Sequence, residues 1–373
     1  MSKNHERSQK NVRLSGRKPS IKLLCFKELA LKVYKYRGGE QDIFLRDLGS
    51  LQEDYFWSPL RSNLNDPCEG FVSVDYLKSQ LDLFHKFIAG SNPKITESFE
   101  NVQQALDALI AMNDKAGIYS LSKTPLDELL WAHYANSHCG FCIEYDLDKL
   151  MEFGKNDFHR FDVVYEKQPP KLEMEDLNSL ENSALFVQKL IGCKSERWAY
   201  EKEIRIVTSL AGRQEYDFRA VTSIYFGLRM KPDHKQAIME TLAGRGIKYF
   251  QIELANNSYT FSSVQVVDPY SDIPRYRYSI APIKEWAIAP EYLKEELRQY
   301  SSYLYKAAEI VRREPYCSEV EMVEFSSEKS TPGNPVIFVQ YKRSENRWVN
   351  HYLTLDEIDA QYSAIEDLDA PST

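Results

Sequence analysis

The sequence predicts an α+β fold: a mixed or antiparallel sheet core with inserted helices, plus a small C-terminal α+β module. Short runs rich in β-branched and aromatic residues recur between turn residues along the chain, as strands do. Stretches with helical spacing interrupt them, for example residues 232–242 and 291–313. The composition is 43% hydrophobic and 27% charged, which is ordinary for a globular protein.

The 373 residues are enough for more than one domain, and the character of the sequence changes twice. Residues 1–20 have almost no apolar side chains and hold six basic residues against Glu6, so we expect a disordered basic tail that makes at most a weak contact with a polyanion. Residues 21–285 are expected to form the main α+β domain, and residues 286–373 an accessory α+β module.

Strands are expected where apolar or alternating runs end in turn residues. Gly38 and Gly39 end the first such run. In chain order the expected strands are residues 32–39, 54–59, 116–122, 141–146, 161–165, 198–209, 223–227, 247–252, 261–267, 320–325, 336–341 and 348–353.

Helices are expected between these strands. Thr124 is predicted to cap one of them with Pro125 at its first position, and Gly140 suits its C-terminal end. The other expected helices are a short one after residue 42, two within 74–113, then 185–193, 232–242, 291–313 and 355–368.

Several classes of protein are disfavoured by composition. The net charge of −8 argues against a body that binds nucleic acid by charge alone. The sequence has no run of 18 apolar residues, so we expect no membrane-spanning segment. It also shows no apolar leader, so we expect no secretion signal. Six scattered Cys are typical of free thiols in a reducing compartment. We therefore expect a cytoplasmic protein without membrane contact.

Two polar clusters are not interpreted as sites. Cys139 and Cys142 lie close to two histidines, but no second Cys or His pair has zinc spacing, so we expect packed thiols and no metal. Glu144 and Asp146 share one face of an expected strand, and we interpret them as a solvated face rather than a two-carboxylate site.

Residues 198–209 are the most informative stretch. If they form one strand, Glu201, Glu203 and Arg205 share one face, and Ile204 and Ile206 share the other. Two like charges in a row cost free energy unless cations, hydrogen bonds or a ligand compensate them.

Five sequence blocks together carry a family resemblance. They are Lys35-Tyr36-Arg37, Asn65-Asp66-Pro67-x-Glu69, Ser122, Trp131-Ala-His133-Tyr134-Ala135 with His138-x-Gly140, and Trp198-x-Tyr200-Glu201-Lys202-Glu203-x-Arg205. In this order they resemble a bacterial domain-of-unknown-function family of the DUF2971 type, over roughly residues 32–275. The resemblance implies an association with phage defence or stress response.

Arg37 ends an early expected strand, Ser120 and Ser122 end another, and Glu201 and Glu203 open a third. In this order the residues also resemble the motifs of R-S-E class ADP-ribosyltransferases. This resemblance implies that NAD is the substrate and that a protein or nucleic acid is the acceptor. Leu121 stands where that class has Thr.

The roles follow from the second resemblance. Glu203 is the expected catalytic carboxylate, Glu201 its acceptor-side partner and Ser122 the orienting hydroxyl. The expected NAD-binding residues are Arg37, Ser120, Tyr36, His133 and Tyr134.

The alternative is a non-catalytic sensor or binding module. In it Arg37, Asp66, Glu69 and Glu203 form a structural ion network. The transferase needs Arg37 and Glu203 to line one open cleft, whereas the network needs them buried and mutually paired.

Overall fold

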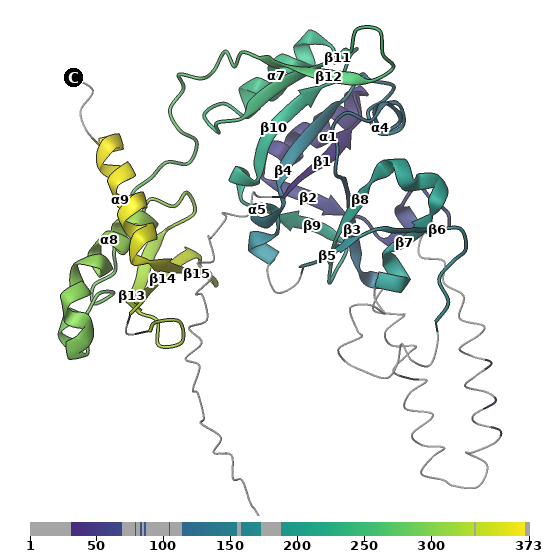
Figure 1. Ribbon diagram of the computed structural model, residues 1–373. Coiled ribbons are helices and arrows are strands. Elements are labelled where there is room, and N and C mark those ends of the chain that lie inside the picture. The colour runs from purple at the N-terminus through teal and green to yellow at the C-terminus, as the bar shows by residue number, and fades with distance from the viewer. Residues whose placement is uncertain are drawn as a thin grey trace, which may run out of the picture.

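The computed structural model describes residues 31–68, 79, 83, 86, 104, 114–154, 158–172, 188–331 and 333–369 (Figure 1). The expected basic tail and almost all of the expected helical stretch 74–113 lie outside the described residues. The fold is α+β, as the sequence predicts. No helix in the described ranges is long and apolar enough to cross a membrane.

The main domain is built on one mixed sheet with the strand order β12-β11-β10-β4-β1-β3-β8-β5. Its strands are β1 (Lys32–Arg37), β3 (Gly117–Ser122), β4 (Phe141–Asp146), β5 (Phe158–Asp162), β8 (Glu203–Thr208), β10 (Val221–Phe226), β11 (Lys248–Leu254) and β12 (Phe261–Val266). Neighbours are antiparallel except β10 and β11, which α7 (Pro232–Thr241) connects as a crossover. Two small sheets pair β2 (Tyr55–Ser58) with β9 (Gly212–Glu215), and β6 (Val164–Glu166) with β7 (Cys193–Ser195).

Hydrophobic side chains cover both faces of the large sheet. Val33 packs in a core with Phe44 of α1 (Gln41–Gln52) and Ile238 of α7. Tyr36 packs in a second core, edge-on against the fully buried Trp131 of α4 (Glu128–Tyr134). Because Val33 and Tyr36 are three residues apart on β1, they point to opposite faces. One hydrophobic core therefore packs against each face of β1. A short helix, α5 (Leu147–Met151), follows β4.

The C-terminal module is an antiparallel meander of β13 (Glu319–Phe325), β14 (Val336–Ser344) and β15 (Arg347–Thr354), with α8 (Ser301–Val311) and α9 (Leu355–Asp369) (Figure 1). It has its own core, which includes Leu304 and Val320. An ion pair of 2.7 Å between Arg219 and Glu314 joins it to the main domain.

Three expectations about elements outside the cavity described below are wrong. The cap of α4 is Asp127, whose carboxylate accepts the amides of Leu129 and Leu130, so Thr124 is not the N-cap. Residues 291–313 do not form one helix, because extended backbone at Leu293 separates the 3-10 turns Pro290–Tyr292 and Glu295–Tyr300, which precede α8. Residues 161–165 are divided between β5 and β6.

Glu144 does not lie on a solvated face. It is buried, and its carboxylate accepts hydrogen bonds from Tyr34, Thr222 and Tyr225 and pairs with Lys32. These donors lower the pKa of Glu144 even though burial alone would raise it. It is a structural carboxylate that ties β4 to its neighbours.

Candidate active site

A cavity of about 390 Å³ opens where β1 and β3 separate. The register between the two strands consists of the pair Tyr34 and Ser122. Beyond that pair Lys35 bridges the gap, because its Nζ donates a 2.8 Å hydrogen bond to the carbonyl oxygen of Ser120. The polar or charged residues that line the cavity are Tyr34, Lys35, Tyr36, Arg37, Arg46, Asn63, Asn65, Ser120, Ser122, Tyr134, Lys194, Glu201 and Glu203.

Glu201 and Glu203 reach this cavity from a turn rather than from one straight strand. Residues Glu196–Glu201 form a 3-10 helix, and Lys202 adopts a left-handed conformation with φ of +46°. The strand begins only at Glu203, so the prediction of one strand over residues 198–209 is wrong in its first half. The Ser122 hydroxyl donates a 2.8 Å hydrogen bond to the carbonyl of Glu201 and holds the turn against β3.

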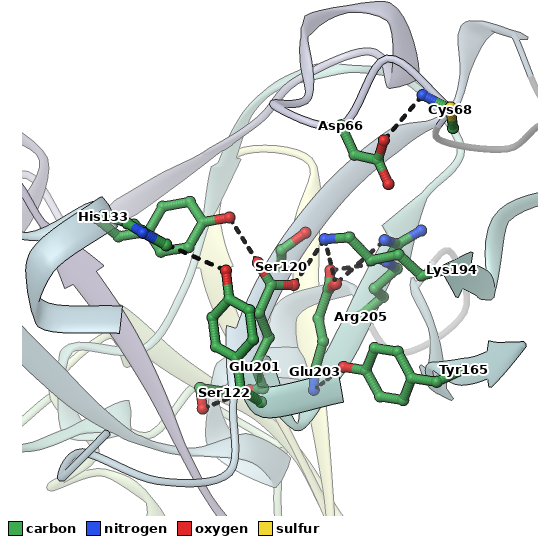
Figure 2. Close-up of polar contacts among 12 residues, drawn as sticks. Asp66, Cys68, Ser120, Ser122, His133, Tyr165, Lys194, Glu201, Glu203 and Arg205 are labelled. Atoms are coloured by element: carbon green, nitrogen blue, oxygen red, sulfur yellow. Dashed lines mark hydrogen bonds and ion pairs between the residues drawn. The ribbon is translucent and has the colours of Figure 1, made fainter. Parts of the chain in front are cut away.

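Lys194 of β7 lies between the two carboxylates (Figure 2). Its Nζ is 2.6 Å from Glu201 Oε2 and 3.2 Å from Glu203 Oε2. All three side chains are buried. One shared ammonium reduces the repulsion between the two carboxylates and keeps them close together.

Arg205 fixes the charge of Glu203. Its Nε donates to Glu203 Oε1 at 2.8 Å and its Nη2 to Oε2 at 3.2 Å, and the guanidinium is fully buried. Burial alone would raise the pKa of Glu203, but Arg205 and Lys194 outweigh it and hold that pKa below its usual range. Glu203 is therefore ionised at neutral pH. The phenol oxygen of Tyr165 accepts the backbone amide of Glu203 at 2.8 Å.

Glu201 is shifted in the opposite direction. Burial and the nearby charge of Glu203 raise its pKa, although Lys194 and the Tyr134 hydroxyl, which donates at 2.6 Å to Oε1, oppose the shift. Neighbouring carboxylates with separated pKa values are typical of sites in which one group exchanges protons while the other stays charged.

Arg37 lines the same cavity but is paired elsewhere. Its Nη1 is 3.7 Å from Asp47 Oδ1, and its Nη2 donates to the Tyr119 hydroxyl at 3.1 Å. Arg46 contacts the same carboxylate at 2.8 Å, so Asp47 is shared by two cations. The expected network in which Arg37 pairs with Glu203 is not what the described residues form.

Lys35 is the second cation that β1 contributes to the cavity. Among the described residues it has no ion pair, and its Nζ lies 4.8 Å from the centre of the Tyr119 ring. Burial and the neighbouring Arg37 lower its pKa to about 7. An anion in the cavity would favour the charged form of Lys35.

The other predicted site residues divide into two groups. Ser120, Tyr36 and Tyr134 line the cavity, and the Ser120 hydroxyl bonds to Glu203. His133 does not line it: the imidazole is exposed, with Nδ1 3.1 Å from the Tyr200 hydroxyl. Asp66 is buried, and its carboxylate accepts the amide of Cys68 as part of the loop.

Glu69 lies outside the described residues. Sequence reasoning did not assign Lys35 or Lys194 to the site. Lys35 could have been found, because it stands in the same block as Arg37 and shares its strand face. Nothing in the sequence around Lys194 connects it with the two glutamates. In the described ranges no group of three or more His, Cys, Asp or Glu side chains could hold a metal ion.

Comparison with known proteins supports one part of the expected resemblance. Residues 130–206 match the family described as "Protein of unknown function (DUF2971)". The match runs from α4 to β8 and includes Tyr134, Lys194, Glu201 and Glu203, but it does not reach Arg37. Neither the curated proteins nor the solved structures contain a significant match to the chain.

Proposed function

We propose that this cavity binds the nicotinamide and its ribose, at one end of NAD. We further propose that the protein transfers the ADP-ribosyl group to a protein or nucleic-acid acceptor. The observation that carries the proposal is the pair Glu201 and Glu203, which line one cavity and lie 2.6 Å and 3.2 Å from the same Lys194 ammonium. Arg37 and Ser122 line the same cavity, in the chain order of the R-S-E transferases. The volume of about 390 Å³ is at the lower end for small-molecule sites, so the ribose and nicotinamide would occupy it while the adenosine half extends outward.

In the proposed reaction the bond between C1′ of the ribose and the nicotinamide nitrogen breaks, and its electron pair leaves with nicotinamide. The ionised Glu203 stabilises the oxocarbenium-like charge that develops on the ribose. A nucleophile of the acceptor then forms a bond with C1′, and its proton passes to Glu201, whose raised pKa makes it the better base. Lys35 and Arg37 supply positive charge for the phosphates.

The second candidate is a non-catalytic sensor or binding module. It is favoured by one observation: both oxygens of Glu203 already accept from Arg205, and one of them also contacts Lys194. In that case the network stabilises the turn before β8, and a ligand in the cavity is bound without reaction.

Incubation with NAD labelled in its ADP-ribose part separates the two candidates. For a transferase, the wild type releases nicotinamide and labels an acceptor, and Glu203→Gln lowers the rate by about 10²–10³ while changing NAD affinity little. Glu166→Gln, which changes an exposed carboxylate on β6, is the matched control and should leave the rate unchanged. Binding of NAD without nicotinamide release in the folded wild type would support the sensor.

A further inference from the structure

A larger cleft lies at the opposite end of β8 from the first cavity. Glu203 begins β8 and lines the cavity, whereas Thr208 ends β8 and lines the cleft. At about 3.3 Å per residue the two positions are on the order of 17 Å apart. The cleft has a volume of about 1360 Å³ and lies between the main domain and the C-terminal module. β9 lies on one side of it and the β14–β15 hairpin on the other.

Arginine dominates the charge of this cleft. Five arginines and three acidic residues line it: Arg213, Arg245, Arg277, Arg343 and Arg347, with Glu53, Asp54 and Glu215. This local excess of positive charge stands in a chain whose net charge is −8. A concave surface of one sign concentrates ligands of the opposite sign.

The arginines on the hairpin are weakly compensated. One oxygen of Glu215 lies 3.5 Å from Nη2 of Arg343 and also 3.5 Å from Nη1 of Arg347. Charge-assisted hydrogen bonds are usually shorter, about 2.8 Å. Arg343 is largely buried with its guanidinium 3.3 Å from the centre of the Phe153 ring, and burial lowers its pKa although Glu215 opposes the shift. Two cations thus share one carboxylate oxygen, each through a long hydrogen bond of 3.5 Å.

The main-domain side contributes a different kind of arginine. Arg245 pairs with Asp54 and lies almost entirely buried, 3.9 Å from the centre of the Tyr276 ring, so it belongs to the fold. Arg213 and Arg277 are about 40% exposed, at 45% and 38%. Arg213 pairs with Glu53 at 2.6 Å and Arg277 with Asp54 at 3.4 Å, so a ligand in the cleft would contact them beside these carboxylates.

We propose that this cleft binds single-stranded nucleic acid. Its volume exceeds the range of about 300–1000 Å³ that suits small ligands, which favours a polymer. Guanidinium groups match the geometry of phosphates, and arginines stand on both walls of the cleft, as contact with a chain of phosphates requires. The rings of Phe153 and Tyr276 are covered by the guanidinium groups of Arg343 and Arg245, so contacts with phosphates rather than base stacking would supply the binding. The proposal does not depend on the function of the first cavity.

The test measures how a fluorescently labelled single strand of 12 nucleotides binds to the full chain. Fluorescence anisotropy reports the binding at several salt concentrations. Arg347→Glu on the hairpin and Arg213→Glu on β9 should each weaken binding about tenfold at low salt and reduce the slope of log affinity against log salt by about 1. Arg298→Glu is the matched control, because Arg298 lies in the same module as Arg347 and outside the lining of the cleft. The Arg298 side chain is 58% exposed and that of Arg347 59%, and both substitutions change the charge by the same amount. It should bind the strand as the wild type does.

Three results would overturn the proposal: no binding by the folded wild type at low salt, an equal loss in Arg298→Glu, or polyglutamate binding as tightly as the strand and competing with it. The last result would assign the cleft to an acidic protein segment. Glu203→Gln should bind the strand normally whether or not the first cavity uses NAD, so failure of one proposal can be distinguished from failure of the other.

Discussion

The Arg205–Glu203 pair allows a sharp prediction about stability. Arg205→Met keeps much of the side-chain volume but leaves Glu203 with Lys194 as its one remaining cation among the contacts described above, and it also leaves the carbonyl of Ile191 without the Arg205 donor. Removing one partner of a buried ion pair costs about 3–5 kcal/mol. Because Lys194 still compensates part of the charge, we expect a loss near the lower end, about 3 kcal/mol.

Urea denaturation followed by tryptophan fluorescence measures this loss, which should lower the midpoint by about 1 M. Arg160→Met is the matched control, because Arg160 on the neighbouring strand β5 is half exposed and lies 3.6 Å from Asp148. A surface pair of this kind contributes at most about 1 kcal/mol. If the two variants lost the same stability, the claim that Arg205 compensates a buried charge would be refuted.

Three other substitutions have defined outcomes. Trp131→Ala should destabilise the fold by about 3–5 kcal/mol, because the ring is fully buried and its Nε1 donates to Pro125, and an unchanged denaturation midpoint would place the ring at a surface. Lys35→Met should raise the melting temperature at pH 6, where wild-type Lys35 is charged in both the folded and the unfolded state. Because the pKa of Lys35 is about 7 in the folded state against an ordinary 10.5, the advantage of the variant should shrink as the pH rises from 7 to 10.5. A difference in melting temperature that stays constant over this pH range would argue against a lowered pKa. Gly140→Ala should destabilise and displace the end of β1, because a Cβ there would overlap the carbonyl oxygen of Arg37; normal melting would contradict this packing.

Much of the fold was predictable because its signals are local. The run Phe141–Asp146 is β4 as expected, and the alternation after Glu203 is β8. The turn before β8 was not predictable in the same way. Residues 198–201 were expected to belong to the same strand, yet they form a 3-10 helix that ends at the left-handed Lys202.

The site was predictable only in part for a similar reason. The two glutamates and Ser122 come from short motifs, and the described structure brings them to one cavity. The positions of Lys194 and Asp47 depend on how separate elements pack, which no local pattern encodes. The same applies to the separation of β1 and β3, since their register is a property of the whole sheet.

The most direct test of the NAD proposal is calorimetric titration of the folded wild type with NAD, beside Arg37→Ala and Glu203→Gln. The proposal predicts one site per chain, at least tenfold weaker binding in Arg37→Ala through the lost charge-assisted contact, and nearly unchanged affinity in Glu203→Gln. Absence of NAD binding by a wild-type protein that melts cooperatively would contradict it.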